Sequence, residues 1–272
     1  MPRLPTRQLF FLRLYGFALS MTAGILDPPV YTAKINQMVT NTGWRNTALG
    51  LVTFAGLLVA ALSQPVWGAI SDVTSSRWGR RLPFLVGGSL ANLVFFLILA
   101  LVGNLWLLLI VVVSIQLAAN AVQGAYQGLI PDRVPSTQLG AAAGAKSLTE
   151  ASAAALAPLV AGLVLGLSQW SLTQRVLVVI AILQGIYLLV TGVTVWRMRS
   201  NISSGAPDAA TRTVGLSLRD AVRDTFRIDW QAHPDLPWWL LNRFLFWCGL
   251  LTLRTFLINY MEQVIGLSSA AA

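Results

Sequence analysis

The sequence predicts an all-α membrane protein with an N-terminal bundle of six helices, a polar linker and a seventh membrane span. Hydrophobic residues make up 56% of the 272 residues and charged residues only 11%, whereas soluble globular chains carry about 25% charged residues. Uncharged runs recur along the chain at about 20 residues, the length with which a helix crosses a bilayer. Together, these two observations favour a multi-pass membrane protein.

Intervals without charged residues locate the predicted helices, because a charge inside the bilayer is costly. A Gly-Asn pair inside the longest interval indicates a turn between two helices. The intervals lie between Arg13 and Lys34, at Asn46–Ser71, at Leu82–Pro131 with the turn at Gly103-Asn104, at Ala151–Gln174 with a start as early as Gly140, and at Val176–Val195. They accommodate six membrane spans.

The basic residues lie mainly on alternate connections, which predicts that the N-terminus is cytoplasmic. One side carries Arg3, Arg7, Arg13, Arg77, Arg80, Arg81, Arg133, Arg197, Arg199, Arg212, Arg219, Arg223 and Arg227; the other carries Lys34, Arg45 and Arg175. A signal peptide cleaved after Ala18-Leu19-Ser20 is an alternative for the first span, but Arg13 interrupts its apolar region.

Residues 200–236 change to a polar composition and are predicted to form a cytoplasmic linker between domains 1–199 and 237–272. Ser217 and Asp220 resemble a capping box, and Leu218, Val222 and Phe226 recur at helical spacing, so a short amphipathic helix is expected there. A seventh span follows at Pro237–Tyr260.

Two composition features narrow the possible functions. The net charge of +9 is spread singly or in small groups between apolar runs, so a nucleic-acid partner is not predicted. A single cysteine, Cys248, and a single histidine, His233, exclude an internal disulfide framework and most metal sites and nucleophile-base pairs. We therefore expect no enzyme activity, no metal and no cofactor.

The segment from Gly68 to Phe84 is the most specific motif in the sequence. It reads Gly-Ala-Ile-Ser-Asp-Val-Thr-Ser-Ser-Arg-Trp-Gly-Arg-Arg-Leu-Pro-Phe and resembles the signature loop of the major facilitator superfamily. Its ending is most similar to that of glycoside/cation symporters and sucrose-type transporters. The resemblance implies a gating loop that latches the two halves of a transporter, formed by Gly68, Asp72, Arg77, Gly79, Arg80 and Arg81. The alternative is a positively charged loop that does no gating.

The resemblance also implies a fold of twelve spans, in which two six-helix bundles enclose a site at the middle of the membrane. By this resemblance the seventh span would be the first helix of the second bundle, and the chain would be a fragment that lacks the rest of that bundle. Its partners would be the missing C-terminal helices, the lipid bilayer, a small solute and a coupling ion.

Four amide residues in the fourth span, Gln116, Asn120, Gln123 and Gln127, recur at i, i+4, i+7 and i+11, which places them along one helix face. Residues 116–124 resemble the matching segment of sucrose-type transporters, although those proteins carry an acidic residue where this chain has Gln116. We expect the four amides to line a cavity and bind substrate hydroxyl groups. Hydrogen bonding between helices is the alternative.

Charged residues within the spans are candidates for substrate binding or ion coupling. Asp27 lies about 20 Å along the helix from Arg13, and Arg254 lies about 16 Å beyond Arg243. We hypothesise that Asp27 and Arg254 pair and line the cavity; alternatives are an Asp27 at a proline-broken helix end near the interface and an Arg254 that reaches toward the interface.

Lys146 and Glu150 are spaced i,i+4 near the start of the fifth span, so they form either a local ion pair or part of a coupling network.

The main functional hypothesis is a secondary active transporter in the cell membrane. Its solute would be a sugar, a glycoside or a similar small polar molecule, moved by alternating access and coupled to a proton or a sodium ion. The alternative is a half-length membrane scaffold or assembly subunit without transport activity of its own.

Overall fold

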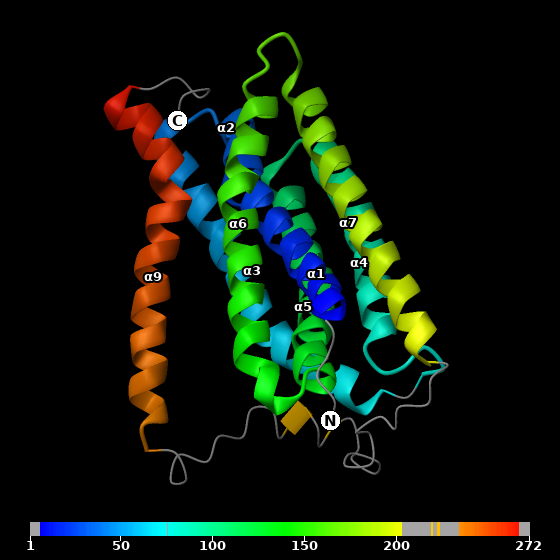
Figure 1. The fold of residues 1–272 in the computed structure, drawn as a ribbon. Helices are drawn as coiled ribbons and strands as arrows, with labels where there is room; N and C mark the ends of the chain where they lie inside the picture. The colour runs from blue at the N-terminus through cyan, green and yellow to red at the C-terminus, as the bar shows by residue number, and fades with distance from the viewer. Residues whose placement is uncertain (1–5, 75, 203–218, 220–221, 224–233, 267–272) are drawn as a thin grey trace.

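The structure is a computed structural model that describes residues 6–74, 76–202, 219, 222–223 and 234–266 (Figure 1). Within these ranges the regular elements are helices and no strand occurs. The elements are α1 (Thr6–Ile25), η1 (Leu26–Val30), α2 (Tyr31–Met38), α3 (Thr42–Val73), α4 (Leu82–Leu101), α5 (Leu105–Arg133), η2 (Ser136–Gln138), α6 (Leu139–Leu165), α7 (Leu172–Ile202), α9 (Leu236–Tyr260) and η4 (Met261–Ile265).

Six helical segments in the described part of the chain are long and apolar enough to cross a membrane: Thr42–Val73, Leu82–Leu101, Leu105–Asp132, Ser136–Leu165, Leu172–Trp196 and Leu236–Leu257. They correspond to predicted spans two to seven. The predicted first span, between Arg13 and Lys34, is not among them. In the structure it is divided into α1, η1 and α2, and Asp27 within η1 has non-helical backbone angles. The fold is that of an all-α membrane protein.

Helix ends follow from short polar signals in the sequence. Asn41 and Asn104 cap α3 and α5, where their side chains accept hydrogen bonds from Gly43 N at 2.9 Å and Leu107 N at 2.8 Å. The C-terminal end of α4 is capped from another helix. The buried Lys34 donates from Nζ to the carbonyl oxygens of Ala100 and Val102, each at 2.8 Å.

Two large buried clusters and a small third one, around Val134 and Ala142, fill the described part of the bundle. α1 lies against α6 and α7, and α5 lies against α3 and α4. One large cluster is mainly aliphatic, and the other includes three tyrosines, Tyr15, Tyr126 and Tyr187. The ring centroid of Tyr15 lies 5.5 Å from that of Tyr126 and 6.2 Å from that of Tyr187.

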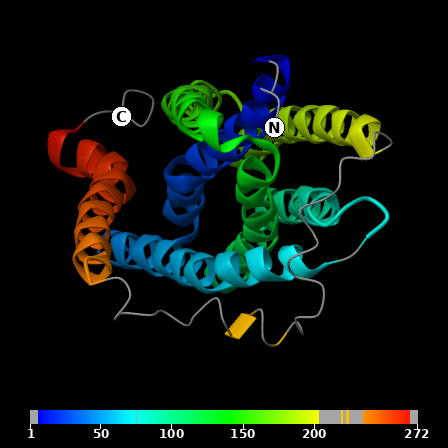
Figure 2. The ribbon, with the colours of Figure 1, turned by 60° about the horizontal axis from the view of Figure 1, so that its bottom comes forward.

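Helix α9 stands beside the bundle and meets it near one end (Figures 1 and 2). Every residue from Pro237 to Leu250 is exposed, whereas Thr255 and Asn259 are buried. The amide of Asn259 donates to Asn46 Oδ1 at 2.6 Å, and Phe256 packs beside Gly50. These contacts join the C-terminal end of α9 to the N-terminal end of α3.

Arg175, the predicted boundary between two spans, lies inside α7, which begins at Leu172. Its guanidinium turns back and donates to the carbonyl oxygen of Leu165 at 2.5 Å.

The predicted amphipathic helix with Ser217, Leu218, Asp220 and Phe226 lies outside the described residues, apart from residues 219, 222 and 223.

Candidate functional site

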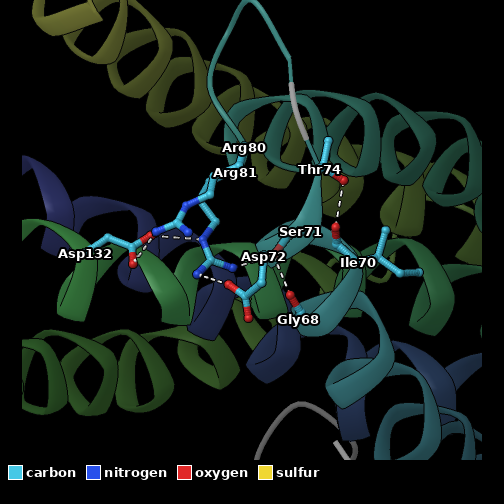
Figure 3. A network of polar contacts seen from close by, with 8 residues as sticks. All are labelled: Gly68, Ile70, Ser71, Asp72, Thr74, Arg80, Arg81 and Asp132. Atoms are coloured by element: carbon cyan, nitrogen blue, oxygen red, sulfur yellow. Dashed lines mark hydrogen bonds and ion pairs between the residues drawn. The ribbon is translucent and has the colours of Figure 1, made fainter. Parts of the chain in front are cut away.

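Arg81 is the centre of a polar network where α3, α4 and α5 end together (Figure 3). Its guanidinium forms ion pairs with Asp72 at the end of α3 and with Asp132 at the end of α5, the latter at 3.1 Å between Nε and Oδ2. It also donates to Ser71 Oγ. Arg80 adds a second contact to Asp132, at 2.9 Å between Nη2 and Oδ1. One buried arginine thus connects the ends of three helices.

The loop geometry explains why this sequence presents Arg80 and Arg81 to the two aspartates. Gly79 has a φ of +84°, a conformation that favours glycine, and its N–H donates to Ser76 O at 2.8 Å. This turn reverses the chain directly before the two arginines. Pro83 then occupies the first turn of α4, where a missing N–H carries no cost.

Among the predicted gating residues, Asp72, Arg80 and Arg81 lie within the network, and Gly79 forms the turn that leads into it. Arg77 is exposed. The sequence reasoning missed Ser71 and Asp132 as members. An acidic residue at the end of a neighbouring span, opposite an arginine-rich loop, was the signal that could have identified Asp132.

Close helix approach at this end depends on Gly124 and Gly128 of α5 rather than on Gly68. A Cβ atom on Gly124 would lie 2.9 Å from Gly68 N, and one on Gly128 would lie 2.3 Å from Arg81 Cζ. A Cβ atom on Gly68 itself would have no neighbour within 4 Å. The main chain of Gly68 thus lies in the close contact, and it is the missing side chain of Gly124 that makes room for it.

The four amides of α5 occupy different environments. Asn120 is buried and its Nδ2 donates to Gln116 O at 2.7 Å and to Gln116 Oε1 at 3.3 Å. Gln116 lies against Gly56 of α3, whereas Gln127 is exposed and Gln123 is half-buried. The amide face therefore runs from the α3 contact to an exposed position.

The structure brings Arg254 of α9 to the helix break at Asp27. Arg254 Nη2 donates to the main-chain carbonyl oxygen of Asp27 at 2.6 Å and, more weakly, to that of Ala23 at 3.4 Å. The two predicted partners thus lie side by side, but the hydrogen bond goes to the main chain of Asp27. Asp27 Oδ1 is buried without a hydrogen-bond partner among the described residues.

Lys146 and Glu150 of α6 form an ion pair at 3.4 Å, close to α1 and α5. Lys146 Nζ lies 5.5 Å from the ring centroid of Tyr126. A Cβ atom on Gly16 would meet both Tyr126 Oη and Glu150 Oε1. The pair therefore faces the bundle interior, where the absence of a side chain on Gly16 leaves room for the carboxylate.

A polar contact that the sequence reasoning missed links α1, α4 and α7. The hydroxyl groups of Tyr15 and Ser89 lie 3.0 Å apart, and those of Ser89 and Thr191 lie 3.3 Å apart. All three residues are buried. In the sequence, this contact could have been suspected from the hydroxyl residues that recur within otherwise apolar spans.

Comparison with known proteins agrees with this architecture. The profile of the Major Facilitator Superfamily matches residues 10–272. A protein of Synechocystis sp. described as an uncharacterized symporter is 35% identical in an alignment of 95 residues that covers 30% of this chain and 18% of that protein. The chain therefore spans only a small part of the relative it matches. Because the profile covers nearly the whole chain, the protein belongs to the Major Facilitator Superfamily.

Proposed function

We propose that this chain is part of a secondary active transporter that moves a sugar, a glycoside or a similar small polar solute by alternating access, with coupling to a proton or a sodium ion. Family membership and the resemblance of the Gly68–Phe84 loop to sugar-transporting branches support the proposal. The amide face of α5 would supply donors and acceptors for solute hydroxyl groups.

The uneven contact of α9 with the bundle is the observation that carries the proposal. Its residues from Pro237 to Leu250 are exposed, whereas Arg254 and Asn259 contact η1 and α3. In alternating access, one side of the transporter is closed while the other is open. The arrangement of α9 matches such a state, with closure at the end of the bundle opposite the Arg81 network.

The distribution of positive charge supports an orientation in the cell membrane. Arg77, Arg80 and Arg81 lie at one end of the bundle, while the opposite end carries Lys34, Arg45 and Arg175. With the arginine-rich loop and the N-terminus in the cytoplasm, the α9 contacts would close the outer side. The domain boundaries at residues 199 and 236 belong to the same proposal.

Uptake by proteoliposomes tests the function. The purified chain would be reconstituted and offered radioactive glucose, sucrose, maltose and melibiose, each with a proton gradient, with a sodium gradient and with none. Accumulation of one sugar only under a gradient supports coupled transport. Equilibration of the sugar without accumulation would show that transport is not coupled to an ion.

The half-length scaffold stays as a second candidate, favoured by the exposed apolar face of α9. Uptake would be compared between the 272-residue chain and the product of its reading frame extended downstream. A continuation with five further spans that gains uptake supports transport. If neither protein moves any of the four sugars but the chain co-purifies with another membrane protein, the scaffold function is favoured.

A further inference from the structure

The break in the first span exposes main-chain oxygen atoms inside the bundle. Pro28 and Pro29 have no N–H group, so the carbonyl oxygens of Gly24 and Ile25 lose their usual helical donors. Asp27 has extended backbone angles of φ −120° and ψ 115°, and its neighbours Leu26, Pro28, Pro29 and Val30 are buried. Main-chain oxygens in such a place need a partner from outside their own helix.

Arg254 provides a positively charged partner for some of these main-chain oxygens. The guanidinium of Arg254 approaches from α9 and donates to the carbonyl oxygens of Asp27 and Ala23. These oxygens lie at the C-terminal end of α1, where the helix dipole adds partial negative charge. The carbonyl oxygens at the break therefore already bind the positively charged guanidinium of Arg254, which belongs to a different helix.

The carboxylate of Asp27 is a further negatively charged group, on the same residue whose carbonyl oxygen binds Arg254. Its Oδ1 is buried and has no hydrogen-bond partner among the described residues, although Arg254 is adjacent. An unpartnered carboxylate oxygen in an apolar bundle carries a large desolvation cost unless a cation or a donor compensates it. The ion pairs of the described residues do not join this carboxylate to Arg254, so the carboxylate has no direct cationic partner there.

We propose that the carbonyl oxygens of Ala23 and Asp27, together with the carboxylate of Asp27, form a sodium ion site that the guanidinium of Arg254 occupies in this conformation. Carboxylate and carbonyl oxygens suit hard cations, and main-chain carbonyls at breaks in membrane helices coordinate sodium ions. Sodium and Arg254 exclude each other, because two positive charges compete for the carbonyl oxygens of Ala23 and Asp27.

If the proposed transport function holds, sodium is the ion that is coupled to transport. When α9 withdraws, Arg254 leaves the break and a sodium ion enters; when the ion leaves, Arg254 returns and closes this end. A proton binds the carboxylate alone, whereas a sodium ion can bind the carboxylate and the two carbonyl oxygens together. The geometry therefore favours sodium over a proton.

Equilibrium binding of radioactive sodium to the purified chain in detergent tests the site without any solute, with choline as the replacement cation. Arg254→Met removes the competing cation and should tighten sodium binding about tenfold, within the usual range of coupling between two ligands. Asp27→Asn should weaken it at least about tenfold. Arg243→Met is the matched control, because Arg243 lies on the same helix and stacks on Trp239 and Trp247.

Failure of the inference differs from failure of the proposed function, since sodium binding is measured in the absence of a sugar. The inference is overturned if neither the unmodified chain nor Arg254→Met binds sodium, or if Asp27→Asn binds it as well as the unmodified chain does. Should Asp27→Asn not elute as a monodisperse species, the comparison of Arg254→Met with Arg243→Met decides alone. Equal affinities in these two variants would overturn the competition.

Discussion

The guanidinium of Arg81 lies directly against the backbone of Gly128, in space that any side chain at position 128 would need. A Cβ atom on Gly128 would lie 2.3 Å from both Cζ and Nη2 of Arg81. The contact explains how a loop arginine can reach Asp132 across α5, because Gly128 lies one turn before that aspartate.

We predict that Gly128→Ala destabilises the protein. The new methyl group must displace the Arg81 guanidinium from its ion pairs, and overpacking of this kind costs about 1 to 3 kcal/mol. Denaturant titration in detergent measures the change. Gly87→Ala is the control, since a Cβ atom there has no neighbour within 4 Å. Equal stability of the two variants would contradict the packing described here.

Gly124 and Gly68 lie at the same helix contact but are predicted to differ in their response to alanine. Gly124→Ala places a Cβ atom 2.9 Å from Gly68 N and 3.1 Å from Gln64 O, both main-chain atoms that cannot rotate away. Helices α3 and α5 must separate, at a cost of about 1 to 3 kcal/mol. Gly68→Ala has open space and should be nearly neutral. The same titration tests both, and a reversed order of stability would refute the prediction.

Asp132→Asn should destabilise the Arg81 network more than Asp72→Asn does. Asp132 accepts from both Arg80 and Arg81, and hydrogen bonds to charged groups contribute about 1.5 to 3 kcal/mol. The side chain of Asp72 is 47% exposed, so its ion pair is expected to contribute less than about 1 kcal/mol. Apparent melting temperatures in detergent compare the two variants, and a larger drop for Asp72→Asn would argue against this ranking.

The positions of the spans could be predicted from the sequence, because burying a charged side chain in lipid costs free energy. The uncharged run from Leu82 to Pro131 and its turn at Gly103-Asn104 correspond to α4 and α5. Arg175 misled the same reasoning, because a local contact to Leu165 lets a charged residue enter α7. A charged residue therefore marks the end of a span only when no nearby carbonyl oxygen binds its side chain.

Contacts between distant segments were less accessible. The motif identified Asp72, Arg80 and Arg81, and the place of Asp132 at the end of a neighbouring span was a further signal. The role of Gly128 depends on how α5 packs against α4, which no local pattern encodes. The hypothesis that joined Asp27 to Arg254 identified two neighbours, whereas it did not anticipate that the main chain would accept the hydrogen bond. Hydrogen bonds to main-chain atoms depend on backbone geometry that residue types alone do not specify.

Lys34→Met should destabilise the end of α4. The substitution keeps the length of the side chain but removes the donor for the carbonyl oxygens of Ala100 and Val102. Leaving buried acceptors unsatisfied costs about 1 to 3 kcal/mol. Hydrogen exchange of the last turn of α4 reports the loss. Arg77→Met, at an exposed position, serves as the control, and equal exchange in the two variants would show that Lys34 does not cap the helix.

Cross-linking of α3 to α9 is predicted to stop sugar uptake if the proposed function holds. Asn46 and Asn259 are in direct contact, so cysteines at both positions, placed in a Cys248→Ser background, should react with a short bifunctional thiol reagent. Holding this end shut prevents alternation. Uptake should fall to the level of empty liposomes and return with a cleavable linker. The single cysteine variants provide the control, and undiminished uptake after complete cross-linking would contradict the gate.

Lys34 has a practical implication for anyone who probes this protein chemically. Lys34 and Lys146 are the two lysines of the sequence; the first is enclosed beneath the end of α4, and the second is engaged with Glu150. Acylating dyes and other amine-directed labels would therefore find few side-chain targets on the folded protein. Mapping its sidedness calls instead for thiol or guanidinium chemistry.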